Sequence, residues 1–391
     1  MKVKIIKGAY IYDSNITNFV KSDLFVRGDK FVNNGDVASS DEIEVLDLSG
    51  KYIVPGLIDV HSHGRAGCDF NRHERMDYEK TLCSYASAGT TSVLATLASD
   101  TYESLLTSID ELSKIRKNKV SKGAKVLGIH LEGRYLNPEK RGAHEISLLK
   151  VPSLSELSTI CKKMAPAPMH ISMAPELDGG MEFIKEAVSL GATVGIAHSN
   201  ADAITSKEAL KNGVISFTHL YNAMRPLYHR EPGNTGVALT SNAYVEVICD
   251  GYHVHPDMVK LAYLAKGKDK FVLITDSMEA TDNGDGEYEI AGMPVTVKDG
   301  CAMTHDGAIA GSLLSMFEGV INICKFADVK YTDAIICATK APAEMVGAYS
   351  YVGSIEAGKQ ADFLVLSSGE VTKDSIPKLE NVCIDGIFID A

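Results

Sequence analysis

The sequence has no long apolar run, and no segment approaches the ~20 consecutive apolar residues that a membrane-spanning helix needs. Its first residues, MKVKIIKGAYIYD, include early lysines but lack the long apolar stretch and the small-residue cleavage site of a secretory signal. We therefore expect a cytoplasmic protein that makes no membrane contact.

The sequence also has no C-x-x-C pair among its eight cysteines. Scattered cysteines in a long chain are weak evidence for disulfide bonds, so reduced and mostly buried thiols are the better expectation. Positive charge is scarce, because 39 Lys and Arg stand against 51 Asp and Glu, for a net charge of −12. This balance argues against a nucleic-acid-binding surface. It also means that any phosphate on a substrate must be held by a local cationic pocket.

Low-complexity segments and solenoid repeats are absent as well. The two ends of the chain, 1–54 and 353–391, read as short strands punctuated by glycine, without helical periodicity. We expect these two ends to form one small β-sandwich domain together. The residues between them follow a different pattern.

Residues 55–352 alternate apolar, β-branched runs with amphipathic helices. Such runs indicate buried parallel strands, and eight strand–helix units predict an α/β protein with a (β/α)8 barrel of the TIM type. The sixth unit is imperfect because residues 232–243 offer only a short helix, and residues 287–303 predict an inserted β-hairpin. The expected strands are 57–63, 90–96, 125–133, 170–176, 192–198, 214–223, 244–251 and 270–277.

Side chains that can bind metals fall at the carboxyl ends of these strands, where barrel active sites form. His61 and His63 are two residues apart on the first strand and therefore share one of its faces. A single strand-end histidine is more often an ordinary hydrogen-bonded residue, but six such groups in register suit a divalent metal. Glu176 lies at the same rim but is left out of the ligand set, as a carboxylate that either faces a helix or supports the ligands. The six metal-binding candidates are therefore His61, His63, Glu132, His198, His219 and Asp276.

Several motifs resemble a known family. The run VPGLIDVHSHG at 54–64 resembles the first-strand signature of the amidohydrolase superfamily. More specific runs are similar to the N-acetylglucosamine-6-phosphate deacetylases of that superfamily, and the resemblance covers nearly the whole chain. These runs are GIHLEGRYLNPEKRGAH (128–144), IAHSNA (196–201), FTHLYNAM (217–224), REPG (230–233), ICDGYHVHP (248–256), LITDSMEA (273–280) and AIAGS (308–312).

The resemblance implies a metal site formed by Glu132, His198 and His219. His61 and His63 would complete a second site that Glu132 bridges, so one or two divalent metals are expected per subunit. Zn²⁺ or Fe²⁺ is expected first, with Mn²⁺, Co²⁺ and Ni²⁺ as alternatives.

The resemblance also implies the chemistry, which is the deacetylation of N-acetyl-D-glucosamine 6-phosphate to glucosamine 6-phosphate and acetate. A divalent metal lowers the pKa of bound water toward ~7. Asp276 would take the proton of that water as general base and return it to the departing sugar amine as general acid. His144, from the GAH motif, would donate a hydrogen bond to the developing oxyanion.

Arg230 and His253 are expected to bind the phosphate, with donors from Asn222 and Ala223 nearby, because the fork of arginine suits phosphate. Without the resemblance, a surface ion pair between Arg230 and Glu231 is an equally good interpretation. The family further implies a homodimer or larger oligomer with phosphate-site residues near the subunit boundary. The remaining substrate-binding candidates are Ala143, Asp250, Ile309, Ala310, Gly311 and Ser312.

Three alternatives stay open. Cyclic-amide hydrolases and D-aminoacylases often use a lysine on the fourth strand as a carboxylated metal bridge, and the expected fourth strand, HISMAPE, has no lysine. A non-enzymatic scaffold or sugar-phosphate sensor would be expected to lose ligands, whereas all six positions are filled. N-acetylgalactosamine 6-phosphate differs from the glucosamine compound in the orientation of one hydroxyl, and the sequence does not separate the two.

Overall fold

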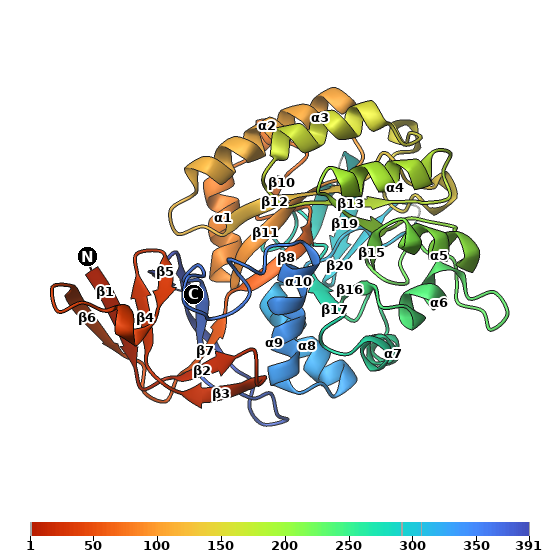
Figure 1. The fold of residues 1–391 in the computed structure, drawn as a ribbon. Coiled ribbons are helices and arrows are strands. Elements are labelled where there is room, and N and C mark those ends of the chain that lie inside the picture. Colours follow the sequence, from red (N-terminus) through yellow and green to blue (C-terminus); the bar gives the residue numbers. More distant parts are fainter. Residues whose placement is uncertain (1, 291, 306, 391) are drawn as a thin grey trace.

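A computed structural model describes residues 2–290, 292–305 and 307–390 of the chain (Figure 1). Eight parallel strands follow one another in a single sheet that curls into a barrel. Backbone hydrogen bonds join the last strand to the first, because Asp276 N–H donates to the His61 carbonyl over 2.9 Å and His63 N–H donates to the Ser277 carbonyl over 2.8 Å. In sheet order the strands are β8 (Leu57–Ser62), β11 (Thr90–Leu97), β12 (Lys125–Glu132), β13 (Met169–Met173), β14 (Thr193–Ile196), β15 (Val214–Phe217), β16 (Tyr244–Ile248) and β17 (Phe271–Ile274).

Helices surround the barrel strands (Figure 1), so most strand residues are buried. They are α1 (Tyr78–Ser87), α2 (Tyr102–Asn118), α3 (Leu154–Met164), α4 (Gly180–Ser189), α5 (Ala203–Lys211), α6 (Gly233–Thr240), α7 (Pro256–Lys266), α8 (Met316–Ala327), α9 (Tyr331–Ala338) and α10 (Lys340–Met345). Side-chain caps fix where several of these helices begin. The Thr101 side chain accepts a hydrogen bond from Ser104 N–H at the start of α2, and Ser315 and Glu318 form a capping box at the start of α8. No helix among the described residues has the length and apolar character needed to cross a membrane.

The predicted fold class is confirmed, and each of the eight expected strands overlaps a barrel strand. The largest difference is in the sixth, which was expected at 214–223, because β15 ends at Phe217. The next residues turn, with positive φ at His219, Tyr221 and Ala223. Strand pairing requires an extended backbone, so the ladder stops where these residues leave that region. The short sixth helix is present as α6.

Two further sheets lie beside the barrel and combine both ends of the chain (Figure 1). They share an apolar core that includes Ile6, Val26 and Phe31 from the first sheet and Ile53 and Phe363 from the second. The first sheet holds β5 (Lys30–Val32), β4 (Leu24–Arg27), β1 (Lys2–Lys7) and β6 (Glu42–Asp47). The second holds β23 (Ile387–Asp390), β22 (Leu379–Ile384), β21 (Phe363–Leu366), β7 (Tyr52–Pro55), β2 (Tyr10–Asp13) and β3 (Asn18–Lys21).

The segment expected as a hairpin at 287–303 holds three antiparallel strands. They are β18 (Gly286–Ile290), β19 (Met293–Lys298) and β20 (Cys301–Thr304). Their apolar residues, Ile290 and Val295 among them, pack on Met278 and Ala310 next to the end of β17. Short elements include β9 (Gly64–Arg65), β10 (Cys68–Asp69) and the 3-10 helices η1 (Asn34–Asp36), η2 (His73–Arg75), η3 (Pro138–Lys140) and η4 (Ile146–Leu148).

Candidate active site

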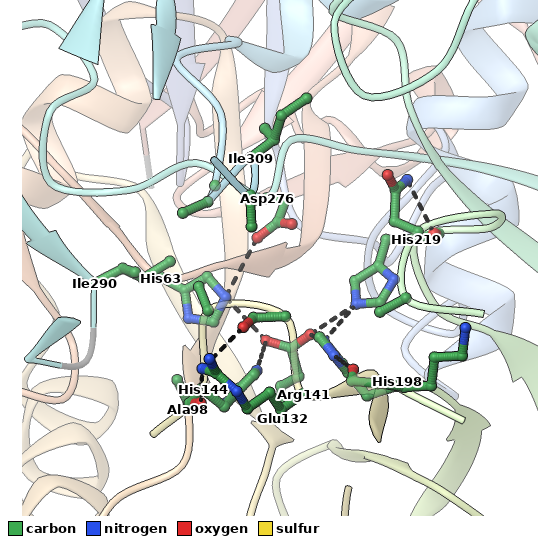
Figure 2. A pocket seen from close by; sticks show the side chains of 18 of the residues that line it. His63, Ala98, Glu132, Arg141, His144, His198, His219, Asp276, Ile290 and Ile309 are labelled. Atoms are coloured by element: carbon green, nitrogen blue, oxygen red, sulfur yellow. Dashed lines mark hydrogen bonds and ion pairs between the residues drawn. The ribbon is translucent and has the colours of Figure 1, made fainter. Parts of the chain in front are cut away.

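A cavity of about 530 Å³ opens at the carboxyl ends of the barrel strands (Figure 2). The loop after β12 contributes residues 138–144 to its wall, and the segment after the inserted sheet contributes residues 308–311. Residues at or just after the strand ends contribute His63, Ala98, Glu132, His198, His219 and Asp276, and the remaining wall is Asn222, Ala223, His253 and Ile290.

Four histidines converge on the carboxylate of Glu132. On one side, Glu132 Oε2 lies 3.0 Å from His63 Nε2 and 3.5 Å from His61 Nε2. On the other, Glu132 Oε1 lies 2.9 Å from His219 Nε2 and 3.2 Å from His198 Nε2. The Nε2 atoms of the two histidines within each pair are 3.4 Å and 3.1 Å apart, respectively.

These spacings fit divalent metal ions. Ligand atoms about 2.0–2.1 Å from a tetrahedral Zn²⁺ are about 3.3 Å from one another, which matches the donor separations. The Nδ1 atom of His198 donates to the Lys140 carbonyl over 2.8 Å, and this leaves Nε2 as the nitrogen available to a metal. Two groups of three donors could each hold an ion: His61, His63 and Glu132, and Glu132, His198 and His219.

The charges around the site favour a cation. Burial opposes the charged form of His63, but hydrogen bonds to Asp276 and Glu132 raise its pKa to about 10. Burial would raise the pKa of Glu132, yet His61 and His198 hold that pKa well below its ordinary value. The pKa of Asp276 is lowered to about 2, because His61 and His63 outweigh its burial. Two ionised carboxylates therefore share a buried site that stabilises positive charge.

The backbone at three of these groups is left-handed, with φ of 44° at His198, 33° at His219 and 53° at Asp276. Such conformations are uncommon for residues with a side chain and gather at functional sites. Each of these residues lies two positions after the last residue of its strand, so the chain turns there and the three side chains face the same cavity (Figure 2). Strand alternation alone does not predict this geometry.

His144 lies beside these candidate metal ligands. Its Nε2 is 3.7 Å from Glu132 Oε2, and its ring packs edge-to-face on that of His198 with 4.7 Å between centroids. Burial, together with the charge of His198, lowers the pKa of His144 to about 3. The ring is therefore neutral near pH 7 and carries a single N–H.

Most of the substrate-binding candidates lie in the cavity wall: Ala143, Asn222, Ala223, His253, Ile309, Ala310 and Gly311. Asp250 is outside that wall and holds His253, whose Nδ1 donates to Asp250 Oδ2 over 2.7 Å. His253 Nε2 is then the nitrogen left for a ligand. Ser312 is buried next to the wall, and its hydroxyl donates to the Thr275 carbonyl.

Arg230 is exposed and is not among the residues that line the cavity. It also does not form the alternative ion pair with Glu231, whose carboxylate lies 3.1 Å from Arg225 instead. The arginine and lysine that do line the cavity are Lys140 and Arg141. Both belong to the run LEGRYLNPEKRGAH, in which only Glu132, Ala143 and His144 were predicted to be site residues. The sequence signal that could have identified them is the pair of adjacent cationic residues shortly before His144.

Glu176, which the sequence left outside the ligand set, joins two loops of the site. Its Oε1 accepts hydrogen bonds from Asn137 Nδ2 over 2.8 Å and from the Asn200 backbone N–H over 2.6 Å. Its Oε2 accepts one from the Ser199 hydroxyl over 2.7 Å. The loop that carries His144 is therefore tied to the turn that follows His198.

The amidohydrolase family model matches residues 52–390 of the chain. An N-acetylglucosamine-6-phosphate deacetylase of Bacillus subtilis is 37% identical over 329 residues, which cover 83% of each chain. An N-acetylgalactosamine-6-phosphate deacetylase of Escherichia coli is 32% identical over 328 residues, covering 84% of this chain and 86% of the relative. The crystal structure of N-acetylglucosamine-6-phosphate deacetylase from Pasteurella multocida superposes with a TM-score of 0.89 at 26% identity and covers 100% of both chains.

Proposed function

This chain belongs to the amidohydrolase family, and we propose that it deacetylates N-acetyl-D-glucosamine 6-phosphate to glucosamine 6-phosphate and acetate. The observation that carries this proposal is the meeting of five candidate metal ligands with Asp276 at one cavity, beside the neutral His144. Four of the five line the cavity, and His61 is buried behind its wall. The identity of the proposed substrate, a sugar phosphate, is inferred from the names of the relatives.

In this proposal Glu132, His198 and His219 hold one divalent metal, and His61 and His63 share Glu132 to hold a second. Such a metal, when bound, lowers the pKa of water toward ~7 and polarises a carbonyl. The imidazole and carboxylate donors favour Zn²⁺ or Fe²⁺, and Mn²⁺, Co²⁺ and Ni²⁺ suit the same donors.

Asp276 orients the attacking water and takes one of its protons. The water oxygen forms a bond to the acetyl carbon, and His144 donates a hydrogen bond to the carbonyl oxygen as negative charge develops there. Asp276 then returns the proton to the sugar nitrogen, so the C–N bond breaks and the nitrogen leaves as an amine. The water oxygen remains in acetate.

The phosphate lies toward His253, Asn222 and Ala223 in this proposal. Arg230 is exposed and lies outside the cavity of its own subunit. We propose that it reaches the phosphate in the cavity of a neighbouring subunit, in a homodimer or larger oligomer. Sedimentation of the wild-type protein tests the assembly, and the KM of Arg230→Ala for the phosphorylated sugar tests the contact. A monomer whose KM is unchanged by the substitution would remove both parts of this proposal.

We also propose a cytoplasmic location. All eight cysteines are unpaired, and six of them are buried. Unpaired thiols suit a reducing compartment. Measured localisation of the tagged protein tests this.

Acetate release from three sugars tests the activity: N-acetylglucosamine 6-phosphate, its galactosamine epimer and unphosphorylated N-acetylglucosamine. The proposal expects the first to be the best substrate, and it expects a chelator to abolish release and added Zn²⁺ or Fe²⁺ to restore it. Equal rates with and without phosphate would refute the phosphate pocket. Faster release from the galactosamine epimer would move the assignment to that sugar, and no release from any sugar would refute deacetylation.

A further inference from the structure

Ser99 links two parts of the site that are far apart in the sequence. It comes two residues after β11, it is buried, and it contacts the ring of His144. The Ser99 hydroxyl lies 3.0 Å from His144 Nδ1, and the Ser99 backbone N–H points at the same nitrogen over 3.3 Å. One ring nitrogen therefore faces both polar groups of one serine.

The direction of these hydrogen bonds follows from which groups can only donate. A backbone N–H has no lone pair, so the Ser99 N–H must donate to His144 Nδ1. The Arg134 backbone N–H likewise donates to Ser99 Oγ over 2.9 Å. With that oxygen already accepting one bond, the Ser99 hydroxyl proton is free to point at Nδ1. Two donors thus face the same nitrogen, and it must present a lone pair.

An imidazole whose Nδ1 keeps its lone pair carries its proton on Nε2. For His144 this is the nitrogen on the metal-ligand side, 3.7 Å from Glu132 Oε2. The opposite tautomer would put a proton between Nδ1 and the Ser99 N–H, and would leave Nε2 without a hydrogen to donate. Only the Nε2–H form can give a hydrogen bond to a carbonyl oxygen at the site.

The backbone around Gly133 makes this contact sterically allowed. Gly133 follows the metal-ligand candidate Glu132 with φ of +141°. A Cβ at Gly133 would lie 2.4 Å from Ser99 Oγ and 2.5 Å from Ser99 N, which is far inside contact distance. The bare glycine therefore lets the end of β11 approach the end of β12 closely enough for Ser99 to reach His144.

We propose that Ser99 is a positioning residue that holds His144 in the Nε2–H tautomer, so that His144 acts as a hydrogen-bond donor to the acetyl carbonyl. The donor role rests on the proposed deacetylation, whereas the tautomer does not. The two are tested by separate readouts, so that failure of one is distinguishable from failure of the other.

The first readout is ¹⁵N NMR of the Zn²⁺-loaded protein with labelled histidine, with His144→Gln used to identify the signals of His144. The expected spectrum shows an unprotonated Nδ1 and a protonated Nε2 for His144. In Ser99→Ala the Nδ1 signal should shift, because the shorter of its two hydrogen bonds is gone. A protonated Nδ1 in the wild-type protein would overturn the proposal whatever the enzyme's activity.

The second readout is the kinetics of acetate release. In Ser99→Ala, kcat should fall about three- to tenfold, the equivalent of one hydrogen bond, and KM should change less than about threefold. Ser99→Thr keeps the hydroxyl and should restore the Nδ1 signal. Ser104→Ala is the matched control: the Ser104 hydroxyl also makes a hydrogen bond near the β11 end, to Asp100 over 3.0 Å, but it does not touch His144. An equal loss of kcat in the control, or an unchanged kcat and Nδ1 signal in Ser99→Ala, would refute the positioning role.

Discussion

Replacement of Asp276 by asparagine separates proton transfer from the rest of the site. Asn is nearly isosteric with Asp and tolerates the left-handed φ of 53° at this position. The two backbone hydrogen bonds of Asp276, to His61 over 2.9 Å and from Ser312 over 2.7 Å, do not involve the side chain. We therefore expect Asp276→Asn to fold normally.

The metal should also remain in this variant. Neither group of three donors includes Asp276, so Glu132, His198 and His219 keep their geometry. An amide cannot take a proton from water near pH 7, so the variant lacks both the general base and the general acid. Such a group contributes about 10²- to 10⁴-fold in rate, which is about 3 to 5 kcal/mol of activation free energy. The loss should appear in kcat.

The assay compares acetate release, metal content and thermal unfolding for wild type, Asp276→Asn and Asp328→Asn. Asp328 is a suitable control because it also has a left-handed backbone, with φ of 54°, and its carboxylate pairs with Lys260 at the surface. The control should keep wild-type turnover. If Asp276→Asn with full metal content turned over within about tenfold of wild type, Asp276 would not be the proton-transfer group.

Three further predictions concern the support of the site and its substrate. Glu176→Gln replaces one of the two carboxylate oxygens that accept three hydrogen bonds from the loops of the site. Chelator competition should then show up to about tenfold weaker metal binding; unchanged affinity would show that Glu176 does not support the metal ligands. Gly133→Ala forces a Cβ against Ser99, and urea unfolding should show a loss of about 2 to 4 kcal/mol. A loss below about 0.5 kcal/mol would refute the close approach. His253→Ala should raise the KM for the phosphorylated sugar about tenfold or more and leave the unphosphorylated sugar unaffected; equal changes for both would remove His253 from the phosphate.

The barrel and the strand-end positions of the candidate metal ligands could be predicted because both depend on local patterns. An apolar run such as 90–96 indicates a buried strand by itself, and the residue after it lies at the carboxyl end in any parallel barrel. The strand ends were less predictable. At 214–223 the apolar pattern continued past Phe217, while the backbone had already turned toward His219.

The cationic side of the cavity shows where such reasoning ends. Arg230 and Arg141 are both arginines in loops after barrel strands, and both lie within runs that carry the family resemblance. The folded chain exposes the first and lines the cavity with the second. Which loop residue faces a cavity depends on the path of the whole loop, and that path is set by distant contacts such as those of Glu176 with Asn137 and Ser199.

The sequence by itself therefore determined the fold class, the family and the side-chain types gathered at one rim, because periodicity and motifs are properties of short segments. Only the tertiary structure decided how they meet. The spacing of donors around Glu132, the left-handed backbone at Asp276, and the contact of Ser99 with a histidine 45 residues away are examples. Each arises where strands and loops remote in sequence are brought within hydrogen-bonding distance, and no local pattern encodes that distance.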